Sequence, residues 1–309
     1  MNPVRFIEVS EEFAGQRLDN FLQRELKGVP KTRLYRALRK GEIRVNKGRV
    51  KAHYRVQSGD SVRIPPLRIA EREQLSHVPQ RWARLLDDGL VYEDKNLWVL
   101  NKPSGLAVHG GSGLSFGLIE CLRLLRSEER YLELVHRLDR DTSGCIMIAR
   151  RTSALKDLHR QLREDRINKR YLALVEGRWS SKRSFVEAPL QKNTVKSGER
   201  IVRVDSAGKP SRTEFRVLQR FANATLLEAR PITGRTHQIR VHAQHAGHPL
   251  LGDEKYGRRE ANQAAKAQGL NRLFLHAAEL GFTDMDGQRQ HVKAPLELSL
   301  SKFLKKLAE

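Results

Sequence analysis

The sequence has very little cysteine and no long apolar segment. Its 309 residues include two cysteines, Cys121 and Cys145, and both lie in apolar stretches. Two such cysteines cannot build a disulfide framework or a thiolate metal site, so we expect both to be small core residues. No run approaches the roughly 18 apolar residues of a membrane-spanning helix, and the first residues, MNPVRFIEVSEEF, lack the apolar core of a signal peptide. We therefore expect a cytoplasmic protein with no membrane partner.

Acidic residues are scarce relative to basic ones. The chain has 58 Lys and Arg against 36 Asp and Glu, a formal net charge of +22. A broad positive field attracts polyanions, of which nucleic acid is the first candidate and a membrane surface the second. Because the sequence shows no membrane segment, nucleic acid is the expected partner. The 39% apolar content is enough for a real core, and this length predicts about two domains.

The positive charge is uneven along the chain, which suggests a domain boundary. Residues 31–55 contain ten Lys or Arg against a single acid, Glu42. After VRIPP the sequence becomes proline-rich, with mixed charge and no sustained apolar period, as in a linker. We expect a first domain at 1–66, a linker at 67–85 and a second domain at 86–309.

Two short amphipathic helices are expected in the first domain, in AGQRLDNFLQREL and PKTRLYRALRK. Gly41 suits a left-handed cap at the end of the second helix, and a turn follows at 46–48. A charge run is usually only a solvated helix face, but this one is almost single-signed, so a nucleic-acid-binding role explains it better. The cations expected to bind are Arg33, Arg36, Lys40, Arg44 and Lys47.

From about residue 86 the pattern is mostly strand, with helices between. We expect an α+β fold, because long βαβ periodicity is absent: a mixed, mostly antiparallel sheet with helices packed on it. The expected helices lie in GLIECLRLLRS, TSALKDLHRQLRED, TGRTHQIRVHAQHAG and LELSLSKFLKKL.

Residues 136–144, HRLDRDTSG, place two carboxylates and two guanidiniums between the apolar runs LELV and CIMIA. A loop between rigid strands can expose a reactive side chain and still hold it in place. We expect Leu138 to point inward and Asp139 to point outward into a cleft. The residues from Asp141 to Gly144 are good turn formers. Judged by this loop alone, Asp139 is better explained as a structural partner of Arg137 or Arg140 than as a catalytic residue.

A second polar cluster changes that balance. A helix beginning at Thr233 would place His237, Arg240 and Gln244 on one face. A half-buried Arg240 would need a carboxylate, and a salt bridge to Asp139 would keep that acid ionised and fix its orientation.

Other kinds of site are not favoured by the sequence. The histidines at 237, 242, 245 and 248 lack the helical spacing, with an acidic third ligand, that zinc helices show, so we expect no metal. There is no nucleophile elbow and no phosphate loop. The glycine-rich HGGSG at 109–113 suggests only a flexible connection.

Residues 136–144 closely resemble the signature of pseudouridine synthases of the RluA type, H-R-L-D-x-x-T-S-G, and match it at every fixed position. Further segments follow in that family's order: NKPSGLAVHGG, KRYLALVEG, GKPSRTEF, ITGRTHQIRVH and GHPLLGD. The likeness covers residues 86–296. The first domain resembles an S4 RNA-binding domain, and the pairing is most similar to members that act on large-subunit (23S) ribosomal RNA or its precursor particle.

The resemblance implies that Asp139 is the essential carboxylate for releasing uracil from C1′ and rejoining it through C5. It implies that Tyr171 stacks on the flipped base, although an isolated strand tyrosine is usually a core residue. It also places Arg137 and Arg235 against RNA, although Arg137 could be a partner of Asp141. No cofactor is implied, and we expect a monomer. An inactive assembly factor and an N-glycosidase are the competing functions.

Overall fold

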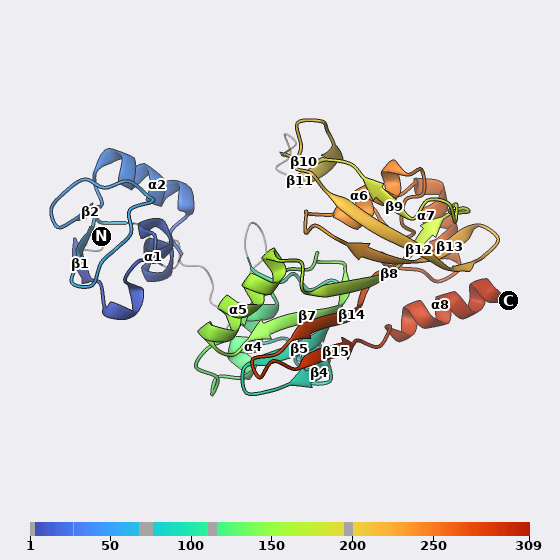
Figure 1. Ribbon diagram of the computed structural model, residues 1–309, viewed down its shortest axis with the longest axis horizontal. Helices are drawn as coiled ribbons and strands as arrows, with labels where there is room; N and C mark the ends of the chain where they lie inside the picture. The colour runs from blue at the N-terminus through green and yellow to red at the C-terminus, as the bar shows by residue number, and fades with distance from the viewer. Residues whose placement is uncertain (1–3, 27, 68–76, 111–115, 195–199) are drawn as a thin grey trace. The chain divides into compact units, whose positions relative to one another are not determined.

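The computed structural model describes residues 4–26, 28–67, 77–110, 116–194 and 200–309. The chain divides into two compact units, 1–76 and 77–309, which are described separately (Figure 1). Within the described residues no helix has the length and apolarity that crossing a membrane requires.

The N-terminal unit packs two helices on a small antiparallel sheet of order β1-β3-β2. Its elements are β1 (Arg5–Glu8), η1 (Glu11–Phe13), α1 (Leu18–Glu25), α2 (Lys31–Lys40), β2 (Arg44–Val45) and β3 (Ser61–Ile64). Both predicted helices are confirmed, and Gly41 ends α2 with a φ of 70°. Asn46 and Lys47 also have positive φ, as the predicted turn requires. Apolar side chains from both helices form the core.

The second unit is built on one large sheet, which confirms the α+β prediction. Its strands run in the order β4-β5-β7-β14-β8-β13-β12-β9, with β15 beside β14 and β6 beside β7. Among the described strands, β7 and β14 are the one parallel pair. The strands are β4 (Leu90–Glu93), β5 (Leu97–Lys102), β6 (Glu133–Leu134), β7 (Ser143–Ala149), β8 (Asn168–Glu176), β9 (Phe185–Glu187), β12 (Arg212–Arg220), β13 (Ala224–Pro231), β14 (Leu275–Thr283) and β15 (Arg289–Lys293). A separate hairpin joins β10 (Leu190–Thr194) and β11 (Arg200–Val204).

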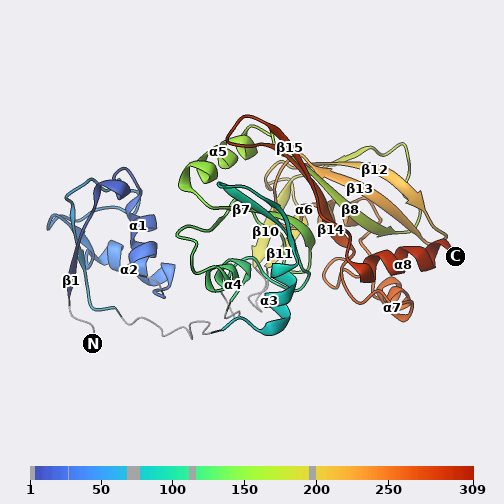
Figure 2. The same cartoon turned by 90° about the horizontal axis from the view of Figure 1, so that it is seen from below.

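Helices cover both faces of this sheet. They are α3 (Gln80–Asp87), α4 (Leu118–Leu125), α5 (Thr152–Arg163), α6 (Gln238–His245), α7 (Arg259–Ala267) and α8 (Leu298–Ala308). Figure 2 shows α4 on the opposite side of β7 from α5. Farther along the sheet, Ile239 of α6 packs on one face with Ala173, whereas Phe303 of α8 packs on the other with Leu174. Helices therefore pack on both faces of the sheet, although β9, β12 and β15 keep exposed residues.

The expected linker at 67–85 differs in part from the structure. Residues 68–76 lie outside the described residues, but α3 occupies Gln80–Asp87 and buries Leu86. Pro79 directly precedes this helix. Its single buried leucine gives too short an apolar pattern to reveal the helix from the sequence.

Candidate active site

Asp139 lies in the loop between β6 and β7, as predicted, and its side chain is 18% exposed. Leu138 beside it is buried. The loop joins β7 through Gly144, whose φ is 108° and whose missing Cβ would collide with the backbone of Ala277 on β14. Glycine is therefore required where the strands meet, and the close approach fixes where the loop leaves the sheet.

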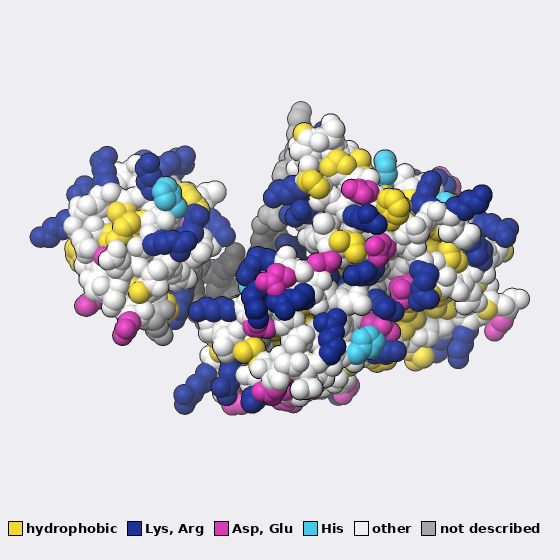
Figure 3. All heavy atoms as spheres, in the orientation of Figure 1, with side chains coloured by type: hydrophobic (Ala, Val, Ile, Leu, Met, Phe, Trp, Pro, Cys, Tyr) yellow, Lys and Arg dark blue, Asp and Glu magenta, His cyan; other side chains and the backbone are white. Residues whose placement is uncertain are grey.

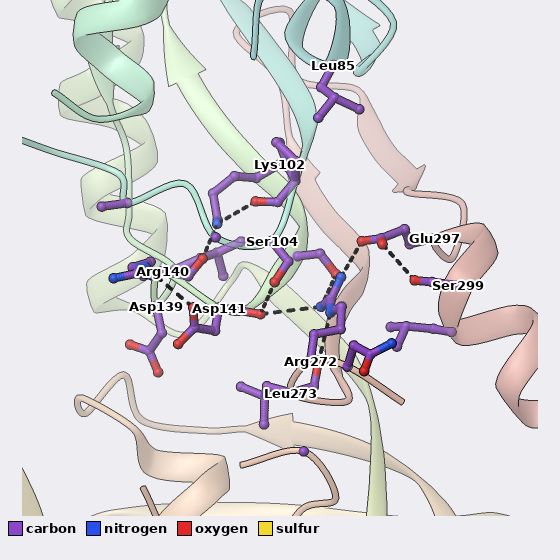
Figure 4. Close-up of a pocket in the computed structure, with 18 of the residues that line it drawn as sticks. Leu85, Lys102, Ser104, Asp139, Arg140, Asp141, Arg272, Leu273, Glu297 and Ser299 are labelled. Carbon is purple, nitrogen blue, oxygen red and sulfur yellow. Dashed lines mark hydrogen bonds and ion pairs between the residues drawn. The ribbon is translucent and has the colours of Figure 1, made fainter. Parts of the chain in front are cut away.

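Carbonyl oxygens of this loop are held by side chains from other elements (Figure 4). The buried Lys102 ammonium donates to the Arg140 carbonyl at 3.0 Å, and Ser104 Oγ donates to the Asp141 carbonyl at 2.8 Å. Arg272 also donates to the Asp141 carbonyl at 3.3 Å. Burial lowers the pKa of Lys102 to about 7. These contacts hold the backbone that carries Asp139 without engaging its carboxylate.

Arg240 on α6 lies beside Asp139, with its Nη1 at 3.5 Å from Asp139 Oδ2. Its stronger partner is Asp253, which accepts from Nε and Nη2 at 2.7 Å each and is itself fully buried. Burial opposes the charge of Arg240, but the hydrogen bonds and charge of Asp253 raise its pKa above the ordinary value. The sequence does not single out Asp253, although it ends the segment GHPLLGD at 247–253. Asp253 fixes the guanidinium, and the guanidinium is then available to Asp139.

The prediction that α6 begins at Thr233 was wrong. The helix begins at Gln238, and His237 before it has a φ of 53° in the left-handed region. Gln238 Oε1 accepts hydrogen bonds from Thr233 Oγ1 and from the Arg235 backbone, which stabilise the preceding segment as a turn. Gln244 is exposed rather than sharing the buried environment of Arg240.

His237 is a second neighbour of Asp139. Its Nδ1 lies 2.7 Å from the Tyr256 hydroxyl, and that hydroxyl accepts a hydrogen bond from Val202 N at 3.0 Å. The tyrosine proton is then best donated to Nδ1, which places the ring hydrogen on Nε2. Nε2 lies 3.9 Å from Asp139 Oδ2, the oxygen that Arg240 also approaches. In the described part of the chain, no hydrogen bond or ion pair is made to Asp139 Oδ1.

Tyr171 lies on β8, between Ala277 of β14 and Ala229 of β13. Burial, together with the negative charge of Asp139, raises the pKa of its phenol. The ring is therefore a neutral surface close to the carboxylate. The structure thus brings together the three residues predicted to act at the site: Asp139, Tyr171 and Arg240.

The predicted RNA-contacting arginines of this unit lie at the surface. Arg137 is exposed and lines the same groove as Asp139. It is not the partner of Asp141, which pairs with Arg140 at 3.6 Å. Arg235 is exposed as well, and its Nε donates to the Pro210 carbonyl at 3.2 Å.

Two histidines near the site are hydrogen-bonded to protein groups. His242 is buried between Thr213 Oγ1 at 2.9 Å and the Ala188 carbonyl at 3.1 Å, and His248 Nδ1 donates to the Glu176 carbonyl at 2.8 Å. Across the described ranges no group of three His, Cys, Asp or Glu is placed to hold a metal. Of the HGGSG segment, residues 111–113 lie outside the described residues.

The predicted cations of the N-terminal unit are mostly exposed. Arg36, Lys40, Arg44 and Lys47 are at the surface. Arg33 is half-buried and pairs with Glu42 at 2.9 Å, so it offers less free charge than predicted. Figure 3 shows more Lys and Arg side chains than acidic ones on the visible face of this unit.

Comparison with known families gives two matches. Residues 96–245 match the model described as RNA pseudouridylate synthase, and residues 16–62 match the S4 domain. The range 96–245 includes all three residues that meet at the site, Asp139, Tyr171 and Arg240.

Curated relatives and solved structures agree with these matches. The chain is 56% identical to the ribosomal large subunit pseudouridine synthase C of Escherichia coli strain K12, over 98% of this chain and 97% of the relative. It is 57% identical to the protein of the same name from Yersinia pestis, over 97% of this chain and 94% of the relative. The structure of human RNA pseudouridylate synthase domain containing 4 aligns with a TM-score of 0.59 and 26% identity, covering 73% of this chain and 95% of that one.

Proposed function

This chain belongs to the RNA pseudouridylate synthase family, and from that premise we propose that it isomerises specific uridines of large-subunit (23S) ribosomal RNA to pseudouridine. In this isomerisation the bond from C1′ to N1 of uracil breaks and a bond from C1′ to C5 forms. N1 gains a proton and C5 loses one, so the reaction needs no external oxidant, phosphate or cofactor.

The observation that carries the proposal is the environment of Asp139. A base or nucleophile must be ionised and held in place before the substrate arrives. Arg240 and His237 both approach Oδ2 of Asp139, from 3.5 and 3.9 Å. Oδ1 is therefore the oxygen left for the ribose, either to add at C1′ or to remove a ribose proton.

His237 acts in this proposal as a positioning residue. Burial lowers its pKa below the ordinary value, although the charge of Asp139 opposes the shift. At neutral pH the ring is therefore neutral, and the bond to Tyr256 keeps its N–H toward the carboxylate. A neutral donor holds the carboxylate without adding a second full positive charge, which would weaken Asp139 as a base or nucleophile.

The target uridine must leave its helix or loop before it can rotate. Extruding a nucleotide costs a few kcal/mol and costs least in loops and mismatches. We propose that the uracil stacks on Tyr171 and that Arg137, exposed at the rim of the groove, enters the space that the base leaves. Arg235 contacts the RNA beside it.

The N-terminal unit, which contains the S4 match, contributes affinity for RNA rather than chemistry in this proposal. Its exposed cations, including Arg36 and Lys40, bind phosphates without reading the sequence. We propose that the protein acts as a monomer in the cytoplasm, on ribosomal RNA or its precursor particle.

Three outcomes are distinguished by incubating the protein with ribosomal RNA from cells that lack it. Pseudouridine in the RNA is expected. Free uracil and an abasic site would instead indicate an N-glycosidase, and unchanged RNA would indicate an inactive assembly factor. Asp139→Asn should form no pseudouridine while it still binds RNA, because the amide retains the shape of the side chain but not its charge.

A further inference from the structure

The groove that holds Asp139 extends well beyond the site of reaction. Its volume is about 2130 Å³, whereas a pocket for one small molecule is typically about 300–1,000 Å³. One flipped nucleotide therefore leaves much of the groove free. In Figure 4 the Lys102 side chain lies between Asp139 and Leu85 of α3, and Glu297 and Ser299 stand at the start of α8.

One wall of this free part is a face of α3. The groove is lined by Gln80, Arg81, Arg84, Leu85 and Asp88, and this spacing is that of one side of a helix. Leu86 points the other way and is buried at 3% exposure. The ring of Trp82 packs at Gly105, so α3 is also anchored to the loop that follows β5. The α3 face is therefore a fixed surface of the second unit.

The charge on this wall is not neutralised. Arg81 and Arg84 are both exposed, and in the described part of the chain neither forms an ion pair. Across the groove, Glu297 is already paired with Arg272. Asp88, the C-cap of α3, is the acid on this face, one helical turn from Arg84 but not in an ion pair with it. The Arg81 guanidinium lies over the Trp82 ring, 5.1 Å from its centroid, a contact that leaves the charge unpaired. Two guanidiniums without an ion pair, about one helical turn apart in a groove that a polyanion enters, form a binding surface for phosphate.

We propose that Arg81 and Arg84, the α3 wall, bind the phosphodiester backbone of the RNA strand adjoining the flipped uridine. The proposal rests on the proposed function, because the same groove must admit that uridine. RNA is favoured over an acidic protein because the strand is continuous with the nucleotide at Asp139. Guanidinium forks contact phosphate oxygens in pairs, whatever the base sequence.

The test is the salt dependence of RNA binding by the Arg81→Ala/Arg84→Ala variant. Each phosphate contact to a single strand contributes about 0.7 to the slope of log affinity against log salt. The slope of log affinity against log salt should be smaller by about 1.4 in the variant. At about 0.1 M salt the variant should bind unmodified large-subunit RNA transcript about 25-fold more weakly than the parent, and near 1 M salt the two should bind equally. KM should rise by a similar factor while kcat stays unchanged.

The matched control is Arg151→Ala/Arg163→Ala. It removes two exposed arginines from the start and end of α5, and neither lines the groove. Its slope should change by less than half as much as that of the α3 variant. An equal change in the control would mean that only overall charge matters, and an unchanged slope in the α3 variant would equally overturn the proposal.

Two further results separate this inference from the function itself. If the parent formed no pseudouridine, the proposed function would fail, but the binding slope would still test the α3 wall. If the variant were impaired only on precursor particles and bound naked transcript normally, the wall would contact a protein and the RNA assignment would be rejected. Far-ultraviolet circular dichroism checks that the variant is folded, because Trp82 fluorescence itself responds to the loss of the Arg81 side chain over its ring.

Discussion

The two units carry positive charge in different ways. In the N-terminal unit, cations such as Arg36 and Lys40 stand on the outer face of a helix and are exposed. In the second unit, which contains Asp139 and is called the catalytic unit below, Lys102 and Arg240 are buried. Lys102 donates hydrogen bonds to loop carbonyls, and Arg240 pairs with carboxylates. Exposed cations add affinity for any polyanion, whereas buried ones fix the position of particular atoms.

Two ion pairs show the energetic side of the same contrast. Arg33 and Glu42 pair with side chains 36% and 31% exposed, and such a pair contributes about 0–1 kcal/mol. Arg240 and Asp253 pair at 7% and 0% exposure, so removing one partner should cost about 3–5 kcal/mol. We therefore expect the stability of the catalytic unit to depend on its buried charges, and that of the N-terminal unit to depend little on its exposed ones.

The largest effect is expected from Arg240→Met. The variant leaves Asp253 charged and buried, so the free energy of unfolding should fall by about 3–5 kcal/mol. Asp139 loses its nearest cation, so kcat should fall by at least about 100-fold. Urea unfolding followed by tryptophan fluorescence measures the stability, because Trp82, Trp98 and Trp179 all lie in the catalytic unit.

Two comparison variants sharpen this result. Glu42→Gln breaks the exposed pair and should change stability by less than about 1 kcal/mol. Arg240→Met combined with Asp253→Asn removes both buried charges and keeps Oδ1 as the acceptor for the backbone amides of Lys255 and Tyr256, so it should recover part of the stability but little of the turnover. Recovered turnover in that double variant would show that Arg240 acts only through folding.

The two units should also differ in their response to acid. Burial lowers the pKa of His136 to about 4 and lowers those of His242 and His276. The unfolded chain then binds more protons between pH 6.5 and 4, so the catalytic unit loses stability as pH falls through this range, by up to about 3 kcal/mol for His136.

The described residues of the N-terminal unit include no buried histidine. Its single histidine, His53, is exposed. A hydrogen bond from Arg17 lowers the pKa of Asp19 to about 2, so the stabilisation from Asp19 is lost only below pH 3.8. Amide hydrogen exchange at pH 7 and pH 5 should therefore show weaker protection in the catalytic unit alone. Equal weakening of both units would contradict this comparison.

A smaller change than in the buried charge pair is expected when the RNA-binding cations of the N-terminal unit are removed. Arg36→Ala/Lys40→Ala should weaken RNA binding by up to about 25-fold at about 0.1 M salt, with turnover at saturating RNA unchanged. Reversing the charges of Arg33, Arg36 and Lys40 together should weaken it further. Arg33→Ala alone should weaken RNA binding least, because the Arg33 charge is already neutralised by Glu42. A dissociation constant equal to that of the parent in the triple variant would refute a binding role for this helix.

Local patterns were enough to predict much of this molecule. The periodicity of leucines in α1, α2 and α5 predicts those helices, and the apolar run CIMIA predicts β7. The motif HRLDRDTSG indicates Asp139, and its glycine is explained by the contact between β7 and β14.

What escaped prediction depends on contacts between distant residues. The sequence alone suggests no more than a turn residue at Asp253, because its pairing with Arg240 arises only in the folded chain. The start of α6 depends on Gln238 folding back onto the turn before it and on the left-handed backbone of His237. The sequence does not predict the α3 wall, because the groove face of this helix is mostly polar and resembles an ordinary solvent-exposed face. The tertiary structure is needed to show that this face lines the groove.

The most direct test maps pseudouridines across large-subunit ribosomal RNA in cells that lack this protein and are complemented with the parent chain or with Asp139→Asn. The account predicts that specific positions are modified with the parent and remain uridine with the variant, at equal protein levels. Full modification by Asp139→Asn, or a pattern that does not depend on the protein at all, would contradict it.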